Sequence, residues 1–214
     1  MTSLQRAATL PVRFFARPAD AVARDLVGAL IVSSIDGQSA MGRIVETEAY
    51  LGYDDPASHG YRHRRHAQNE ALYGPPGSWY VYRSYGIHWC ANLVCQAEGD
   101  GSAVLLRAVE PLEGVEVMRG RRRLDEPGLL CAGPGRLCQA LGITRLGLDG
   151  QMMEQSPVMV LARNGWAGAV EATPRVGITK AVGWPLRFAA AGSPWVSRRG
   201  ISIPRVAARE RSRG

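Results

Sequence analysis

The alternation of hydrophobic and polar positions predicts a chain made mostly of short strands with a few helices between them. Pro18 suits the first turn of a helix, and Val22 and Leu26 would share one face of that helix. Apolar runs follow at residues 29–34 and 42–50, and the turn-forming residues IDGQS stand between them. Two such runs joined by turn residues are typical of a β-hairpin.

Aromatic runs in the middle of the chain predict a second pair of strands. WYVYRSYG and IHWCANLVC meet at Tyr85 and Gly86, where we expect the chain to turn. The remaining patterns predict strands at 102–109, 158–162 and 185–191, and helices over 133–143 and from Pro111 to Arg122.

Two stretches lack a regular pattern. Residues 1–17 are expected to form a loose arm. Residues 52–78 are rich in Gly, Pro, His and Arg, and a loop of this length inside a compact domain is usually functional or disordered. No internal repeat or linker is found, so one mixed α/β domain is the simplest interpretation. The pattern does not predict the strand order.

Composition narrows the class of protein. The 214 residues are 46% hydrophobic and 21% charged, which is typical of a globular protein. No apolar run approaches the roughly 20 residues of a membrane helix, and the first residues lack the pattern of a secretory signal, so a cytoplasmic location is expected. The cysteines do not form the paired C-x2-C sets of a zinc site and are interpreted as small buried hydrophobic residues: Cys90, Cys95, Cys131 and Cys138.

Basic residues dominate the charge. The net charge is +7, and Lys180 is the only lysine among 26 basic residues. A genome biased towards arginine codons would explain that ratio but not the clustering of arginines at 62–65 and 119–123. Such clusters indicate a polyanionic partner, since the planar guanidinium suits phosphate. Six further arginines lie within 198–214, where a solvated tail is the preferred interpretation.

The segment ETEAY carries the clearest candidate chemistry. In an extended strand Glu46, Glu48 and Tyr50 would point to one face. Arg107 stands alone in the apolar run VLLRAV, and a buried guanidinium needs an anionic or strongly polar partner. A Glu–Arg pair in a cleft can hold a water molecule and keep the acid ionised as a general base. The residues alone do not rank the two glutamates.

Aromatic residues accumulate around this segment. Tyr80 and Tyr82 would share a strand face, and Tyr85 would protrude at the turn. Rings beside arginine clusters indicate a surface that holds unpaired bases. Together with an acid that activates water, they point to an enzyme acting on an extruded nucleotide. The alternatives are a non-catalytic binder of damaged or single-stranded nucleic acid, a carbohydrate hydrolase using both glutamates, and a zinc deaminase, whose H-x-E and P-C-x-x-C set is absent.

Long motifs carry a family resemblance. They are RDLVGALIV, GRIVETEAYLGYDDPASH, GPPGSWYVYRSYGIHWCAN, AVLLRAVEPLEG, GPGRLCQALGI, PRVGITKA and PLRFAAAGSPWVS. Over residues 12–197 the chain resembles the alkyladenine (3-methyladenine) DNA glycosylase family, the type without a helix-hairpin-helix. The resemblance implies a single α+β domain over 1–214, with a curved antiparallel sheet, surrounding helices and flexible arms at 1–11 and 198–214. It also implies a monomer that uses no cofactor.

The resemblance assigns three residues to the reaction. Glu48 matches the general base that activates a water for attack on C1′ of the deoxyribose. Arg107 and the backbone carbonyl of Val176 match groups that hold this water. Glu46 is then interpreted as structural. Because only Lys180 offers an amine for a Schiff base, we expect a monofunctional hydrolase.

Five more residues match the binding site for the base. Tyr50, His59 and Tyr82 match the aromatic walls around a flipped base, and Tyr85 matches the ring that inserts into the duplex. Asn92 matches the asparagine that crowds the 2-amino group of normal guanine.

The implied activity is base excision repair of double-stranded DNA that contains damaged purines. This repair would take place at the bacterial nucleoid. The expected substrates are 3-methyladenine and 7-methylguanine, with hypoxanthine and ethenoadenine requiring a proton donor. Two departures concern lesion range and DNA affinity. Gln68 stands where an arginine is frequent, and Arg83-Ser84 stands where aliphatic residues are frequent.

Overall fold

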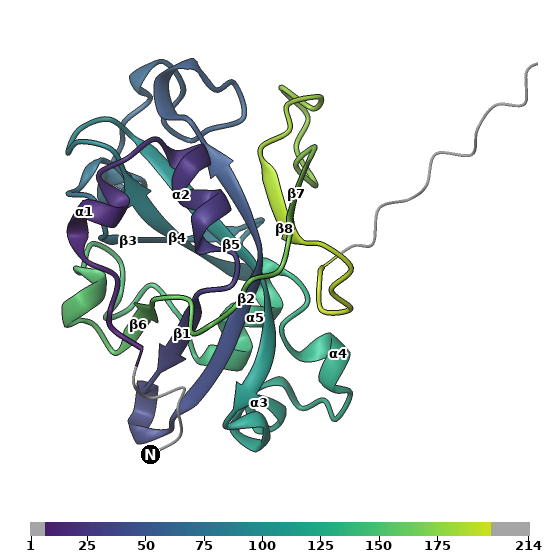
Figure 1. The fold of residues 1–214 in the computed structure, drawn as a ribbon. Coiled ribbons are helices and arrows are strands. Elements are labelled where there is room, and N and C mark those ends of the chain that lie inside the picture. Colours follow the sequence, from purple (N-terminus) through teal and green to yellow (C-terminus); the bar gives the residue numbers. More distant parts are fainter. Residues whose placement is uncertain (1–6, 198–214) are drawn as a thin grey trace, which may run out of the picture.

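The computed structural model describes residues 7–197, which fold around one antiparallel sheet (Figure 1). The expected Arg-rich tail at 198–214 and the first six residues of the expected N-terminal arm lie outside this description. Within it the sheet has the strands β1 Leu30–Ser33, β2 Ala40–Tyr50, β3 Trp79–Ser84, β4 His88–Cys95, β5 Ser102–Glu113, β6 Val158–Leu161, β7 Val170–Thr173 and β8 Arg187–Ala190. The helices are α1 Val12–Phe15, α2 Ala19–Leu26, α3 Val115–Arg122, α4 Pro127–Leu130 and α5 Pro134–Leu141.

Strand β2 organises the sheet. The main order is β3-β4-β5-β2-β1-β6, and every pairing is antiparallel. On one edge of β2, β1 pairs with residues 40–43 and β8 pairs with residues 46–48. The β7–β8 ribbon therefore stands beside the end of β2, as Figure 1 shows in yellow-green. The predicted α+β class with an antiparallel sheet is confirmed, and the sheet is not closed.

Most of the predicted elements are present. The hairpins β1–β2 and β3–β4, the helices α2 and α5, and the strands β5, β6 and β8 all occur where the pattern placed them. The long stretch 52–78 contains 3₁₀ turns at Gly52–Asp54, Tyr61–His63 and Glu70–Tyr73. From this stretch, the residues that line the site described below are Ala57, Ser58, His59 and Leu72. All four cysteines are buried, as interpreted from their spacing.

Two expectations are wrong. Residues 12–17 are not part of a loose arm, since α1 forms there and Phe15 is fully buried in the core. Pro111 does not begin a helix but lies inside β5 opposite Gly42, next to a shift in register. A strand tolerates proline at such an irregularity. The helix α3 starts only after Gly114, whose φ of +67° favours glycine. Strand β7 and helix α4 were not predicted.

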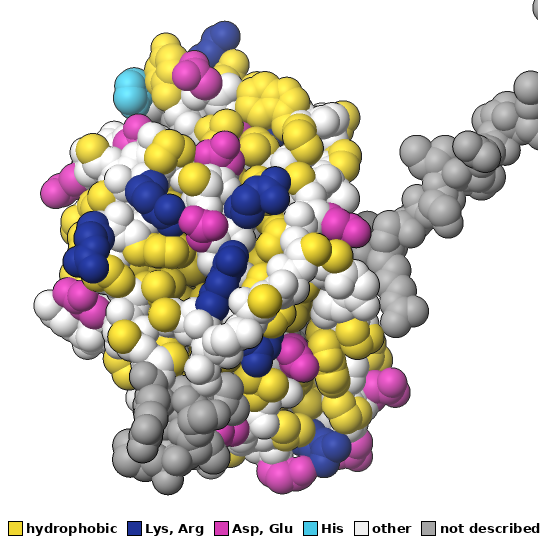
Figure 2. All heavy atoms as spheres, viewed as in Figure 1, with side chains coloured by type: hydrophobic (Ala, Val, Ile, Leu, Met, Phe, Trp, Pro, Cys, Tyr) yellow, Lys and Arg dark blue, Asp and Glu magenta, His cyan; other side chains and the backbone are white. Residues whose placement is uncertain are grey.

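Helices pack on the sheet without reaching the length of a membrane span. Helix α2 packs against β2, β5 and β8, and α5 packs against β4 and β5. No helix in the described part of the chain is long and apolar enough to cross a membrane. On the face shown in Figure 2, basic and acidic side chains are interspersed.

Candidate active site

The end of β2 presents alternate side chains to its two faces. Thr47 Oγ1 donates to the carbonyl of Ala23 on α2 at 2.8 Å. Its neighbours Glu46 and Glu48 point the other way, and both are fully buried. Tyr50 shares their face, because its hydroxyl donates to Glu48 Oε2 at 3.0 Å. The expectation that these three side chains share a face is therefore confirmed.

Arg107 on β5 joins the two glutamates. Its Nε lies 3.2 Å from Glu46 Oε1, and its Nη1 lies 3.3 Å from Glu48 Oε2. Burial alone would lower the pKa of Arg107, but the charges of Glu48 and Glu46 outweigh burial and raise it. The buried arginine therefore remains charged, and the predicted Glu–Arg pair involves both acids.

Glu48 receives hydrogen bonds on both oxygens. Oε1 accepts the backbone N–H of Val176 at 2.7 Å, while Oε2 accepts from Tyr50 and Arg107. Burial raises the pKa of Glu48, and the charge of Arg107 and these hydrogen bonds offset only part of that effect. Val176 thus lies beside the acid and contacts it through its backbone N–H. The water contact expected of its carbonyl stays a prediction.

Glu46 has a different set of partners. It accepts from Arg187 Nε at 2.6 Å, from the Ser197 N–H at 2.6 Å and from the Ser197 hydroxyl at 2.9 Å. Burial raises the pKa of Glu46, but Arg107, Ser197 and Arg187 together outweigh burial and lower it. A carboxylate so fully occupied by protein groups suits a structural role. Arg187 and Ser197 were not singled out from the sequence, although both lie inside the motif PLRFAAAGSPWVS.

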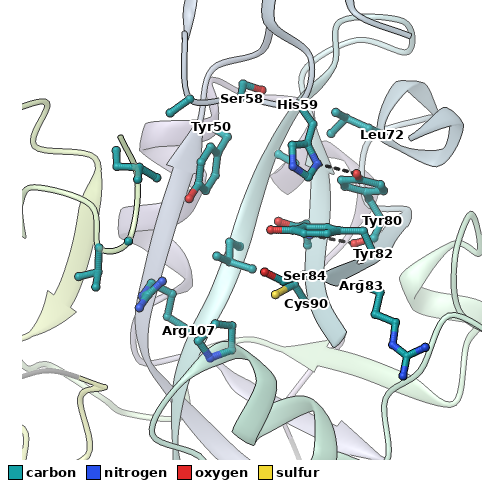
Figure 3. A pocket seen from close by; sticks show the side chains of 18 of the residues that line it. Tyr50, Ser58, His59, Leu72, Tyr80, Tyr82, Arg83, Ser84, Cys90 and Arg107 are labelled. Atoms are coloured by element: carbon teal, nitrogen blue, oxygen red, sulfur yellow. Dashed lines mark hydrogen bonds between the residues drawn. The ribbon is translucent and has the colours of Figure 1, made fainter. Parts of the chain in front are cut away.

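A cavity of about 480 Å³ opens beside this cluster. Figure 3 shows Tyr50 on one side of it, His59, Tyr80 and Tyr82 on the other, and Arg107 below them. The rings come from β2, from the loop after it and from β3. The space between the two sides is open to a flat group. We call this space the ring-lined cavity.

One wall of the ring-lined cavity is a packed cluster. The rings of Tyr80 and Tyr82 stack with centroids 5.4 Å apart, as expected for side chains on one strand face. His59 Nδ1 lies 2.7 Å from the Tyr80 hydroxyl, and its ring centroid lies 4.5 Å from that of Tyr82. Burial, followed by the charges of His66 and Arg64, lowers the pKa of His59, so this ring is neutral at pH 7. Tyr80 joins the wall beside the rings that the resemblance implied.

Tyr85 occupies the tip of the β3–β4 hairpin. Its φ is +49° and that of Gly86 is +68°, and the Ile87 N–H donates to Ser84 O at 3.0 Å. Two successive residues with positive φ are typical of a type I′ turn. The Tyr85 side chain is 90% exposed at the rim of the ring-lined cavity. The expected turn with a protruding ring is present.

Asn92 lies on β4 in the lining of the same cavity and is 4% exposed. Its Nδ2 donates to the backbone carbonyl of Tyr80 at 3.0 Å, which fixes the orientation of the amide. Cys90 lines the cavity nearby, and burial raises the pKa of its thiol. Within residues 7–197, no three His, Cys, Asp or Glu side chains come together as a metal site.

The sequence profile described as methylpurine-DNA glycosylase matches residues 13–194. The chain belongs to the methylpurine-DNA glycosylase family. The resemblance seen in the motifs is thereby confirmed. Enzymes of this family are DNA-repair hydrolases that cleave the N-glycosyl bond of a purine base.

Curated relatives cover nearly the whole chain. A protein of Rhodopseudomonas palustris strain HaA2 is 50% identical over 186 residues, or 86% of this chain and 88% of that protein. A protein of Rhizobium meliloti is 50% identical over 191 residues, or 89% and 97%. One of Methanoculleus marisnigri is 47% identical over 198 residues, or 89% and 100%. Each is provisionally named a 3-methyladenine DNA glycosylase.

A second buried ion pair lies next to the reacting groups. Arg175 donates to both carboxylate oxygens of Asp55 and, at 2.9 Å, to the carbonyl of Ala49. Its guanidinium lies 4.7 Å from the ring centre of Tyr50, and the next residue, Val176, donates to Glu48. The pair was not predicted. The only signal was a charged residue inside each of the motifs DDPASH and PRVGI.

Asp55 also shapes the loop that enters the wall of the ring-lined cavity. Its carboxylate accepts the backbone N–H of Leu51 at 3.2 Å and that of Ala57 at 3.0 Å. His59 follows two residues after Ala57, so Asp55 links the end of β2 to one wall of the ring-lined cavity. The glycosylase thus combines a buried carboxylate, a charged arginine and aromatic walls. Such a set can activate water beside a flat, extruded group.

Proposed function

We propose that this chain flips alkylated or deaminated purines out of duplex DNA and hydrolyses their N-glycosidic bond. This would be the first step of base excision repair in the cytoplasm, on the bacterial nucleoid, by a monomer without a cofactor. The observation that carries the proposal is the position of Glu48. It is fully buried next to Arg107 and adjoins the ring-lined cavity through Tyr50 and Val176.

In the proposed reaction Glu48 accepts a proton from a water that attacks C1′ of the deoxyribose. The new bond joins the water oxygen to C1′, and the bond between C1′ and the purine nitrogen breaks with its electron pair leaving on the base. The sugar passes through an oxocarbenium-like state, which a nearby carboxylate stabilises. Arg107 and the Val176 carbonyl would hold the water, and a base that starts as a cation leaves neutral.

Damaged purines would be selected by charge and by shape. Tyr50 and Tyr82 line the cavity with aromatic rings, and a cationic base such as 3-methyladenine or 7-methylguanine gains about 0.5–2 kcal/mol from each ring face that it contacts. Asn92 would exclude guanine by crowding its 2-amino group. Hypoxanthine and ethenoadenine are neutral, so their release would need a proton donor. His59, neutral and held by Tyr80, is one of the walls that such bases would stack against.

Tyr85 would fill the gap that the flipped nucleotide leaves in the duplex. Flipping costs a few kcal/mol and is cheapest at a weakened base pair, so damage is partly selected at this step. The exposed ring at the hairpin tip is placed to stack on the bases beside the gap. Arg83, one of the departures from the family pattern, would add a DNA contact beside this ring.

Release would proceed without strand cleavage. Lys180 is exposed and does not line the ring-lined cavity, so the described residues offer the sugar no amine. Treatment with borohydride during turnover should therefore trap no covalent complex with damaged DNA. Trapping of such a complex would contradict the monofunctional mechanism.

The deciding experiment measures base release from duplexes that each contain one lesion: 3-methyladenine, 7-methylguanine, hypoxanthine or ethenoadenine. We expect Glu48→Gln to lower the single-turnover rate by about 10²–10⁴-fold, because general-base catalysis contributes that much, while the lesion duplex stays bound. Glu98→Gln, at an exposed loop position, is the matched control and should keep the wild-type rate. Binding of every lesion without release by the wild type would favour a non-catalytic binder.

A further inference from the structure

A second cavity of about 510 Å³ adjoins the ring-lined cavity. The two share the wall formed by His59, Tyr80 and Tyr82, so they lie on either side of one layer of rings. Arg83 lines both cavities, and Figure 3 shows its guanidinium pointing away from Tyr50, beyond Tyr82. The residues found only in the lining of the second cavity are Arg64, His66, Gln68, Trp89 and Arg145.

Three arginines from separate parts of the chain meet at this cavity. Arg64 follows the turn Tyr61–His63, Arg83 lies on β3, and Arg145 lies in the loop after α5. No Asp or Glu is among the described residues that line it. A cavity lined by guanidinium groups without carboxylates favours an anionic ligand.

The backbone that carries Arg64 is firmly held. The carbonyl of Arg64 accepts from Asn69 Nδ2 at 2.8 Å and from the Tyr73 hydroxyl at 2.8 Å. Asn69 is 1% exposed and also donates to the carbonyl of His59 at 3.2 Å. These contacts use only main-chain oxygens of the loop. They therefore position Arg64 without neutralising its side chain.

The other two arginines are also held in place. Arg145 Nε lies 2.9 Å from Asp149 Oδ2, and Asp149 Oδ1 accepts the Val81 N–H of β3 at 2.8 Å. This contact uses Nε, and within residues 7–197 the two terminal nitrogens of Arg145 make no hydrogen bond to the protein. The Arg83 guanidinium lies 5.4 Å from the ring centre of Trp89, its partner across the β3–β4 hairpin. A guanidinium stacked on an indole keeps its edge free for a phosphate.

We propose that the second cavity binds one backbone phosphate of the DNA while the damaged nucleotide occupies the ring-lined cavity. The anion is taken to be DNA because the two cavities share a wall, and to that extent the inference rests on the proposed function. Arg64 and Arg145 hold the phosphate, and Arg83 on Trp89 closes the side next to the hairpin tip. The phosphate belongs either to the damaged strand or to its complement.

Binding of a lesion duplex at several salt concentrations tests this site. The variant is Arg64→Gln/Arg145→Gln, and the control is Arg163→Gln, an exposed arginine that lines neither cavity. Because each phosphate contact contributes about 0.9 to the salt dependence, we expect the double variant to lower the slope of log K against log[salt] by about 1. The control should keep the wild-type slope. Thermal unfolding of each variant verifies that it is folded.

Duplexes with one neutral methylphosphonate identify the phosphate. At one position in one strand, the methylphosphonate should weaken binding of the wild type but not of the double variant. That position identifies the strand that carries the bound phosphate. The proposal is overturned if the slope of the double variant equals that of Arg163→Gln. It is also overturned if, at every position in both strands, the loss of binding caused by the methylphosphonate adds to the loss caused by the double variant. These measurements follow binding alone, so they can be interpreted even if the wild type releases no base and the proposed function fails.

Discussion

Arg175 and Asp55 form an ion pair in which neither side chain is exposed to solvent. The pair joins two segments that lie 120 positions apart in the sequence. It lies next to the reacting groups, since the residue after Arg175 donates to Glu48 and the guanidinium packs on Tyr50. A buried pair of this kind is weak evidence for stability by itself, yet removing one partner leaves an unpaired buried charge.

Asp55→Asn should therefore destabilise the protein by about 3–5 kcal/mol, measured by chemical denaturation. The matched control is Glu70→Gln, because Glu70 pairs with Arg65 on the surface, where removal of the charge should have little effect. Arg175→Lys should also lower the rate of base release in protein that remains folded, because it loses the two-pronged contact that positions Val176. Wild-type stability of Asp55→Asn would show that the pair is dispensable.

The rate of base release should fall as the pH falls through a value above the ordinary pKa of glutamate. Burial raises the pKa of Glu48, and only the ionised form can accept a proton from water. Arg107→Gln should move this acid limb to still higher pH, because the charge of Arg107 is the largest influence that lowers the pKa of Glu48. Single-turnover rates on 7-methylguanine suit the measurement, since that base is already cationic. Arg163→Gln should leave the limb unmoved.

Local features of the site could be predicted because they depend on neighbours in the sequence. Strand alternation placed Glu46, Glu48 and Tyr50 on one face, and the turn residues placed Tyr85 at a hairpin tip. An arginine alone in an apolar strand indicated a buried partner for Arg107. Each of these inferences needs only the two-residue period of a strand or the chemistry of a turn.

The distinction between the two glutamates could not be predicted, because it depends on distant segments. Glu46 lies beside Arg187 and Ser197 of the C-terminal part, whereas Glu48 contacts Val176, which lines the ring-lined cavity. Strand β7 was missed for a related reason. Its four residues, VEAT, form a short run of which none is buried, so the strand depends on pairing with β8 and not on its own pattern.

Replacing each of the two glutamates by glutamine, one at a time, should separate effects on stability from effects on activity. Glu46→Gln should cost about 3–5 kcal/mol of stability, because it removes the charge that Arg107 and Arg187 face in the interior. Glu48→Gln should cost less, about 1–3 kcal/mol, because the amide NH2 cannot accept from one set of the buried donors, while loss of a charge that burial disfavours offsets part of that cost. Chemical denaturation and single-turnover base release, measured on the same preparations, give the stability and the activity of each variant. A loss of stability as large for Glu48→Gln would contradict the assignment of separate roles.

Tyr85→Asn should separate the hairpin's own preference from its proposed use in DNA. Asparagine tolerates positive φ better than tyrosine, so relief of the backbone strain at Tyr85 should raise the free energy of unfolding by about 1 kcal/mol. Binding to a damaged duplex should weaken about tenfold, because stacking of a ring on a base contributes about 1–3 kcal/mol. Binding to a lesion that is already unpaired should be spared. Tyr85→Ala, which removes the ring without suiting the turn, should show the same loss of duplex binding without the gain in stability. Equal losses on paired and unpaired lesions for both variants would count against a ring that fills the gap in the duplex.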